Sequence, residues 1–194
     1  MKHFLLLLAF SPILAADAPL LRDDFSSAKL DQRRAMRGEW KFADQTATCT
    51  QDDELFKKNK DHGPILFYDL AYSDAVIRFA VKPDANTKTI VFTANGDEAH
   101  LFRLVFSSAG MAVRAFPAES QDHKAIALAN ESTVKLKAGE WNEVSVEMRG
   151  NNATVKVGDF ARTYQHASIG LAKVNLSVGF SFGTLSVKDL VVTK

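Results

Sequence analysis

An alternation of apolar and polar residues constrains this chain more than any other feature. Every second residue is apolar in a series of short stretches, and turn-forming segments such as 82–86, 95–97 and 107–110 separate them. A period of two residues is the repeat of a β-strand that buries one face. The sequence therefore predicts an all-β, antiparallel β-sandwich with little helix. The apolar sets are Ile77, Phe79 and Val81; Ile90, Phe92 and Ala94; Phe102, Leu104 and Phe106; Met111, Val113 and Ala115; Val144, Val146 and Met148; and Leu176, Val178, Phe180 and Phe182.

Three segments depart from simple alternation. Residues 26–34 are predicted to form one or two helical turns with Ser26 or Ser27 as the cap, and residues 51–61 a surface loop or short helix. The parity of the last run, 185–192, shifts near Lys188 and Asp189, which predicts a β-bulge or an edge.

The first 16 residues have the pattern of a secretory signal peptide. Lys2 and His3 precede an apolar run from Phe4 to Leu14, and small residues follow it, so that cleavage is expected after Ala15 or Ala16. The run is too short for a membrane anchor, and no second run of spanning length follows. We therefore expect an exported protein, periplasmic or extracellular, in which residues 17–194 form a single domain.

Charge and cysteine content exclude several classes of partner. Removing residues 1–16 takes away Lys2 and no acid, which leaves 23 Lys and Arg against 23 Asp and Glu. A balanced charge argues against nucleic acid or an anionic membrane as the main partner. The one cysteine, Cys49, lies in a strand-like segment and is expected to be a small buried residue rather than a reactive thiol.

The order of segments resembles the concanavalin A-like, laminin-G-type jelly roll. Within that fold it is most similar to small exported bacterial domains of the 3-keto-disaccharide hydrolase family. The resemblance implies a glycan-related role, with binding on the concave outer face of one sheet. The segments that carry it are Asp23-Asp24-Phe25, Gly38-Glu39-Trp40-Lys41-Phe42, Tyr72-Ser73-Asp74, Gly139-Glu140-Trp141-Asn142-Glu143-Val144, Val155-Lys156-Val157-Gly158-Asp159 and residues 183–192.

The glutamates of residues 139–157 are the first candidates for sugar chemistry. Glycoside hydrolysis usually needs two carboxylates about 5–10 Å apart. Glu143 and Glu147 lie four residues apart on one strand face, about 13 Å at the backbone. Their alternation with Val144 and Val146 is that of an ordinary polar-out strand, and Trp141 is expected to be a packing residue.

Three arginines interrupt otherwise apolar strands and are the preferred binding candidates. Arg78, Arg103 and Arg114 each fall opposite the apolar face of their strand. If these strands are neighbours, the guanidinium groups share the outer face of one sheet, where Thr93 could join them and Phe116 could add an apolar surface. Arginine makes several planar hydrogen bonds to hydroxyls or carboxylates.

No cofactor or metal site is predicted. The histidines His62, His100, His123 and His166 lack metal-ligand spacing, and His100 is expected to be structural. A calcium ion is conceivable at the Asp52-Asp53 or Asn95-Gly96-Asp97 turns, but neither is rich in ligands.

The leading hypothesis is a monomeric domain that binds a carbohydrate or a related small molecule without catalysis. The alternatives are a glycoside or 3-keto-disaccharide hydrolase on the same fold, and a structural or protein-interaction module of the cell envelope. An enzyme predicts an acid or histidine beside the arginines, and an interaction module predicts an exposed apolar patch instead.

Overall fold

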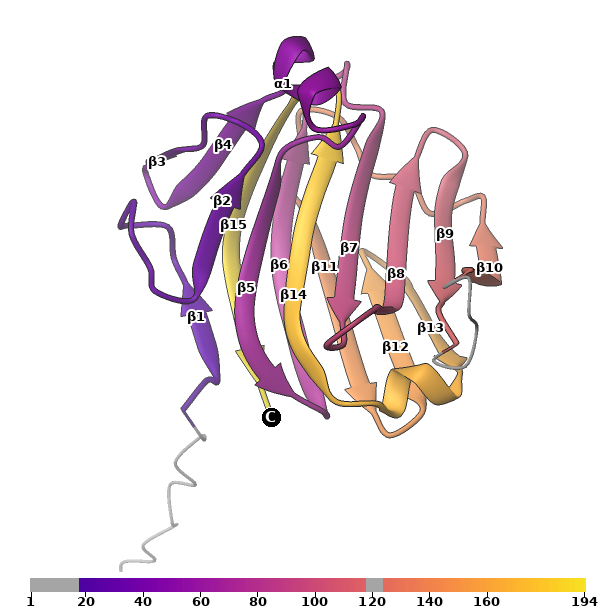
Figure 1. Cartoon of the computed structure of the whole chain (residues 1–194). Coiled ribbons are helices and arrows are strands. Elements are labelled where there is room, and N and C mark those ends of the chain that lie inside the picture. The colour runs from indigo at the N-terminus through magenta and orange to yellow at the C-terminus, as the bar shows by residue number, and fades with distance from the viewer. Residues whose placement is uncertain (1–17, 118–123) are drawn as a thin grey trace, which may run out of the picture.

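Two antiparallel sheets pack face to face in the computed structural model, which describes residues 18–117 and 124–194 (Figure 1). The predicted signal peptide lies outside the described residues, so the domain boundary at residue 17 stays a prediction. No helix in the described part of the chain is long and apolar enough to cross a membrane.

Sheet A has the strand order β13-β12-β11-β6-β15-β4-β3, and β1 pairs with β15. Its strands are β1 (Leu21–Asp23), β3 (Lys41–Ala43), β4 (Thr46–Thr50), β6 (Ala75–Pro83), β11 (Asn142–Arg149), β12 (Asn152–Val157), β13 (Phe160–Gln165) and β15 (Thr184–Thr193).

Sheet B has the order β10-β9-β8-β7-β14-β5-β2 and lies in front of sheet A in Figure 1. Its strands are β2 (Arg33–Met36), β5 (Ile65–Tyr72), β7 (Thr89–Asn95), β8 (His100–Ser107), β9 (Gly110–Ala115), β10 (Ile126–Glu131) and β14 (Lys173–Ser181). The helical elements are α1 (Asp53–Lys58) and a 3₁₀ turn at Ala167–Gly170.

The core lies between the sheets and is built from the alternating residues that the sequence identifies. Phe79 on sheet A stacks against Phe92 on sheet B, with 5.7 Å between ring centroids. Cys49 is buried as expected. The all-β sandwich is confirmed, and of the apolar sets identified in the sequence only Phe182 is not fully buried.

The connection between β6 and β7 carries the chain from one sheet to the other. The backbone N–H of Asp84 donates to the carbonyl of Thr184, and its carboxylate accepts from the backbone N–H groups of Asn86 and Thr87. The N–H of Lys88 then donates to Ser181 in sheet B. This segment has the composition of a hairpin turn, but it forms a corner between sheets.

The first predicted helix is wrong, whereas the second is confirmed. Residues 26–34 form turns that lead into β2, and β2 pairs with β5. Residues 53–58 form α1, with the Asp52 carboxylate accepting from the N–H of Leu55 as the cap. The bulge near Lys188 and Asp189 is confirmed by a register shift and by the positive φ of Asp189.

A buried ionic cluster explains why residues 26–34 turn inward. Nη1 of Arg33 donates to both carboxylate oxygens of Asp23 at 2.8 and 2.6 Å, and the hydroxyl of Tyr68 donates to the same carboxylate at 2.9 Å. The Arg33 guanidinium also lies 4.0 Å from the ring centroid of Phe42. The cluster joins β1 of sheet A to β2 and β5 of sheet B. Because side chains alternate along β2, it also directs the next residue, Arg34, to the outer face of sheet B.

Candidate functional site: the outer face of sheet B

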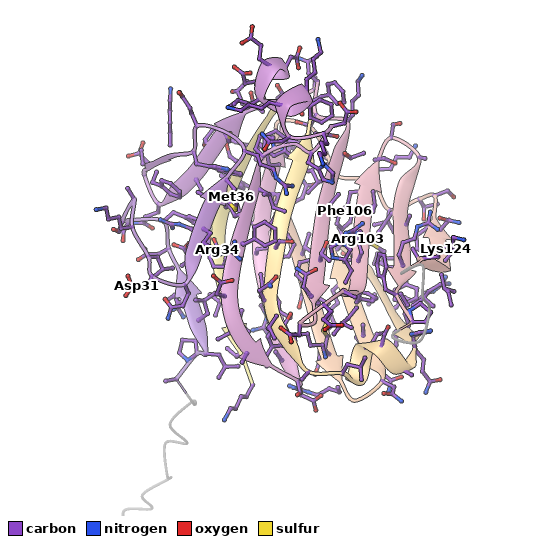
Figure 2. All side chains as sticks on the ribbon, in the orientation of Figure 1. Asp31, Arg34, Met36, Arg103, Phe106 and Lys124 are labelled. Atoms are coloured by element: carbon purple, nitrogen blue, oxygen red, sulfur yellow. The ribbon has the colours of Figure 1, made fainter. Side chains whose placement is uncertain are left out.

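A groove of about 440 Å³ lies on the outer face of sheet B. A row of directly paired residues, one from each of six adjacent strands, crosses this face, and its four middle members line the groove. Figure 2 labels two members, Arg34 near the β2 edge and Arg103 over β8, on opposite sides of β14. We call this the arginine row; in strand order it is Arg34, Phe67, Ser177, Thr93, Arg103 and Arg114.

The Arg103 side chain is held by polar and aromatic contacts. Its Nε donates to the Thr93 hydroxyl at 3.1 Å, and its guanidinium lies 5.1 Å from the ring centroid of Phe116. The Thr93 side chain is buried in the floor of the groove beside Ser177. Burial lowers the pKa of Arg103, although arginine still carries its charge at neutral pH. Its terminal amino groups remain available for a ligand.

A second row beside the first carries amides and a histidine. Nδ1 of His100 donates to Oδ1 of Asn95 at 2.5 Å, and the Asn95 amide donates to Oδ1 of Asn175 at 2.6 Å. Burial, and then the nearby charge of Arg103, lower the pKa of His100 to about 4. His100 is therefore neutral at pH 7, and with Nδ1 as a donor its Nε2 is a hydrogen-bond acceptor. The sequence predicts a structural role for His100, but in the structure His100 also lines the groove.

A closed ion pair lies beside the groove, at the β2 edge of the same face. Nε and Nη2 of Arg34 donate to the two carboxylate oxygens of Asp69 at 2.7 and 2.8 Å. The Arg34 guanidinium also stacks 4.9 Å from the ring centroid of Phe67. This pairing raises the pKa of Arg34 and lowers that of Asp69, so Asp69 stays ionised.

The remaining residues that line the groove are apolar on one side, and residues outside the sheet form its rim. The next row along the strands consists of Met36, Ile65, Gly179, Val91, Val105 and Ala112. Arg37, Asp61 and His62 contribute from segments outside the sheet. Polar rows beside an apolar row, over a partly buried aromatic ring, suit a ligand with both hydroxyl groups and C–H faces.

The three predicted arginines do not share a face. Arg103 and Arg114 are directly paired, and Thr93 pairs with Arg103, so these three candidates lie together. Arg78 lies on β6, which pairs with β11 and β15 in sheet A, and its side chain lies on the opposite side of the sandwich. The prediction of a shared face is wrong for Arg78, because the chain passes from sheet A to sheet B between β6 and β7.

Phe116 also differs from the prediction. It is 6% exposed and packs beneath two groove residues, with its ring 5.3 Å from that of His100 and 5.1 Å from the guanidinium of Arg103. It therefore supports the site and is not an open apolar surface.

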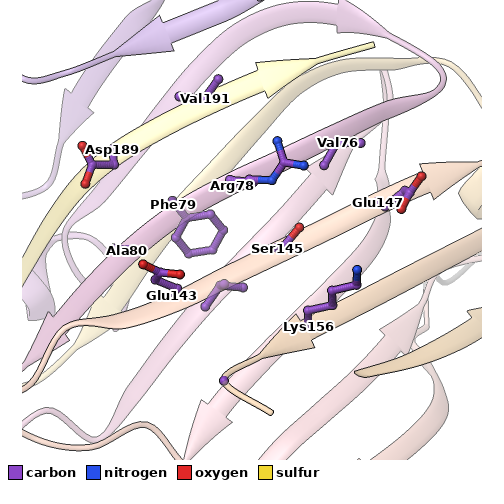
Figure 3. Close-up of a pocket in the computed structure, with 12 residues that line it drawn as sticks. Val76, Arg78, Phe79, Ala80, Glu143, Ser145, Glu147, Lys156, Asp189 and Val191 are labelled. Carbon is purple, nitrogen blue, oxygen red and sulfur yellow. The ribbon is translucent and has the colours of Figure 1, made fainter. Parts of the chain in front are cut away.

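Arg78 lines a separate groove of about 530 Å³ on sheet A, together with Glu143, Glu147 and Lys156 (Figure 3). The two glutamates lie outward on β11 with Ser145 between them, as the alternation predicts. Trp141 lies between two lysines, 5.0 Å from Nζ of Lys82 and 4.8 Å from Nζ of Lys188.

Several groove residues were missed in the sequence. The helix predicted for residues 26–34 includes Arg34, and Asn95 is predicted only as part of a turn that could hold calcium. Phe67, Asn175 and Ser177 are not among the predicted site residues. Asn175 and Ser177 alternate with the apolar residues of their strand, which is the signal that identifies them. Among residues 18–117 and 124–194, no three His, Cys, Asp or Glu residues are grouped so that they could hold a metal ion.

Comparison of the structure with solved proteins identifies the fold. The chain is 10% identical to a Bacillus licheniformis β-glucanase, with 91% of this chain and 99% of that chain covered and a TM-score of 0.63. It is 10% identical to the carbohydrate-binding module CBM66 from Bacillus subtilis, with 84% and 96% covered and a TM-score of 0.61. It is also 10% identical to the CBM2 module of the evolved Dit protein of Lactobacillus casei BL23 phage J-1, with 90% and 94% covered and a TM-score of 0.62.

The chain thus has the concanavalin A-like jelly-roll fold that the sequence predicts. No protein-family model matches it, and no curated protein sequence matches it. The resemblance to 3-keto-disaccharide hydrolases therefore stays a prediction.

Proposed function

We propose that this protein is an exported, non-catalytic carbohydrate-binding domain whose ligand lies across sheet B. The observation that carries the proposal is the arginine row, in which guanidinium, hydroxyl and aromatic groups from six adjacent strands share one outer face and the four middle residues line the groove. Strands in a sheet are about 4.8 Å apart, so the four steps from Arg34 to Arg103 span about 19 Å. This length suits an oligosaccharide rather than a single sugar.

The chemistry of the groove supports sugar recognition. Arg103, Asn95 and His100 supply hydrogen-bond donors and an acceptor, and Phe67 supplies a half-buried ring face. The floor of the groove is preorganised, because the Thr93 and Ser177 side chains are buried within it. The structural neighbours include a β-glucanase and carbohydrate-binding modules, which is consistent with a glycan ligand for this fold.

The carboxylates of the groove argue against glycoside hydrolysis. Asp69 is held ionised by Arg34, so it is unsuited to act as a general acid. Asp61 lies at the rim, in the turn after α1, where it has a positive φ. Among the described residues that line the groove, no further Asp or Glu pairs with Asp61 across the floor.

Glycan-array screening followed by calorimetry tests the proposal. A hydrogen bond to a charged group contributes about 1.5–3 kcal/mol, so Arg103→Ala should weaken binding about 10-fold or more. Arg78→Ala is the matched control, since it removes an arginine from the centre of a strand on the opposite side of the sandwich. Equal losses in the two variants, or no binding on the array, would contradict the proposal. Turnover of 3-keto-disaccharides by the purified protein would replace it with the hydrolase alternative.

A further inference from the structure

Two arginines are directly paired at the β9 side of the groove, and neither forms an ion pair with an acid of the described residues. Arg103 on β8 and Arg114 on β9 are directly paired across the strands. Like charges in this position destabilise a sheet. The one hydrogen bond of the Arg103 side chain is to Thr93, and among the described residues Arg114 makes no side-chain hydrogen bond or ion pair.

Several other arginines of the described residues form an ion pair with an acid. Arg33 pairs with Asp23 in the core, Arg34 pairs with Asp69 at the opposite end of the groove, and Arg162 pairs with Glu131 at 2.6 Å. Asp97 and Glu98 in the β7–β8 turn form no ion pair in the part of the chain that the structure describes, and Glu119 and Asp122 in the β9–β10 connection lie outside the described residues. Within the part of the chain that the structure describes, the β9 side of the groove therefore carries two arginines without an acidic partner.

The lowered pKa of His100 is a second sign of this positive charge. Arg103 contributes to the low pKa of His100, after burial, because a positive charge disfavours the protonated imidazole. His100, Asn95 and Thr93 are neutral at pH 7, so within this end of the groove the positive charge belongs to the two arginines.

We infer that the groove takes an acidic glycan, and that a carboxylate or sulfate of the sugar binds between the guanidinium groups of Arg103 and Arg114. This inference rests on the proposed function and adds the chemical class of the ligand. A planar guanidinium donates two parallel hydrogen bonds to such an anion, and the anion relieves the repulsion between the two arginines. The neutral neighbours then bind the hydroxyl groups of the same sugar.

The direction of the ligand follows from the two ends of the groove. Arg34 is already paired with Asp69, so that end offers a neutral ion pair and the Phe67 ring. The acidic group therefore lies over β8 and β9, and the rest of the oligosaccharide extends over β7 and β14 toward β5.

Calorimetry with three matched oligosaccharides tests the inference. The probes are tetragalacturonate, its carboxyl-reduced neutral counterpart, and a sulfated carrageenan tetrasaccharide. We expect at least 10-fold tighter binding of one acidic probe than of the neutral one, and weaker binding of that probe as salt is raised from 50 to 500 mM. The carboxylated and sulfated probes distinguish the two sources of negative charge.

Variants separate the arginines from a general effect of charge. Arg103→Ala and Arg114→Ala should each remove most of the preference for the acidic probe, and Arg103→Lys should restore only part of it, because lysine keeps the charge but loses the planar fork. Arg78→Ala should leave the preference unchanged. Thermal unfolding of each variant shows whether the fold is retained. Arg114, which has no hydrogen bond or ion pair to a side chain of the described residues, provides a second position if Arg103→Ala is unstable.

The possible results distinguish a failure of the inference from a failure of the proposed function. Equal binding of acidic and neutral probes would overturn the inference and leave the proposed function standing. Binding of the acidic probe that Arg78→Ala weakens as much as Arg103→Ala does would also overturn the inference. Failure of all three probes, together with an empty glycan array, would overturn both.

Discussion

The carboxylate of Asp23 joins the two sheets at the β2 edge of the sandwich, and its removal is the sharpest test of how this fold is stabilised. It is 4% exposed and accepts hydrogen bonds from Arg33, from the Tyr68 hydroxyl and from the backbone N–H of Phe25. Asp23→Ala leaves the Arg33 guanidinium buried, with the backbone carbonyl of Ser27 as its hydrogen-bond acceptor.

The expected loss is large because a buried charge would be left unpaired. Removing one partner of such a pair costs about 3–5 kcal/mol. A chain of this size changes its melting temperature by about 2–4 °C per kcal/mol, so Asp23→Ala should melt roughly 6–20 °C lower than the parent. Urea unfolding followed by circular dichroism measures the same difference as a lower midpoint.

Asp69→Ala is a matched control on β5, because the partner of Asp69 is Arg34, the residue after Arg33 on β2. It breaks the Arg34–Asp69 pair, which has the same chemistry as the Arg33–Asp23 pair but has side chains 47% and 48% exposed. Exposed pairs contribute about 0–1 kcal/mol, so this variant should unfold close to the parent. In the double variant Asp23→Ala/Arg33→Met no buried charge remains, and it should recover part of the loss. If Asp23→Ala unfolds no more easily than Asp69→Ala, the assignment of the buried cluster as a stabilising joint between the sheets is wrong.

Two further predictions concern the groove and its edge. Arg103→Ala should raise the pKa of His100 from about 4 toward its ordinary value of 6.5, as measured by NMR titration of the imidazole; an unchanged pKa would mean that the charge of Arg103 does not act on it. In the parent the unfolded chain takes up the His100 proton below about pH 6.5 and the folded chain only near 4, so this residue should make the protein less stable as the pH falls through that interval. Gly110→Ala should destabilise the protein by more than about 1 kcal/mol in urea unfolding, because Gly110 has φ +114° and an added Cβ would lie 2.3 Å from the carbonyl oxygen of Glu131. In the control Gly150→Ala the φ is also positive, but the space around the added carbon is open. An equal loss of stability in the two variants would mean that backbone strain, and not the contact with Glu131, causes the whole effect.

Which side chains face the core could be predicted from the sequence, because burial in a strand alternates with period two. Ile77, Phe92 and Val146 are buried as the alternation indicates. The same rule correctly placed Arg78, Arg103 and Arg114 on outer faces, since each is out of phase with the apolar residues of its strand.

Which outer face each arginine occupies could not be predicted from alternation. That property depends on strand pairing, which is set by contacts between residues far apart in the chain. The segment 84–88 has the Asp and Asn residues of a hairpin turn, and only its hydrogen bonds to Thr184 and Ser181 make it a corner between sheets. Arg103 and Arg114 were brought together correctly because β8 and β9 are joined by the short turn at 107–110 and pair with each other.

The error at residues 26–34 has a related cause and shows how the fold positions the groove. Local composition permits a helix there, but the carboxylate of Asp23 provides a buried partner that Arg33 reaches only from an extended strand. β2 is an edge strand that pairs with β5 on one side alone, so its position depends strongly on this ion pair. Alternation then directs Arg34 outward, over Phe67 and against Asp69, where it closes one end of the arginine row. Arg33 and Arg34 thus divide two tasks between adjacent residues: the first holds the two sheets together through a buried pair, and the second uses its exposed pair to leave the β2 end of the groove neutral. Among the described residues, the two directly paired arginines without an acidic partner lie at the β9 end, and this difference between the two ends gives the groove a direction.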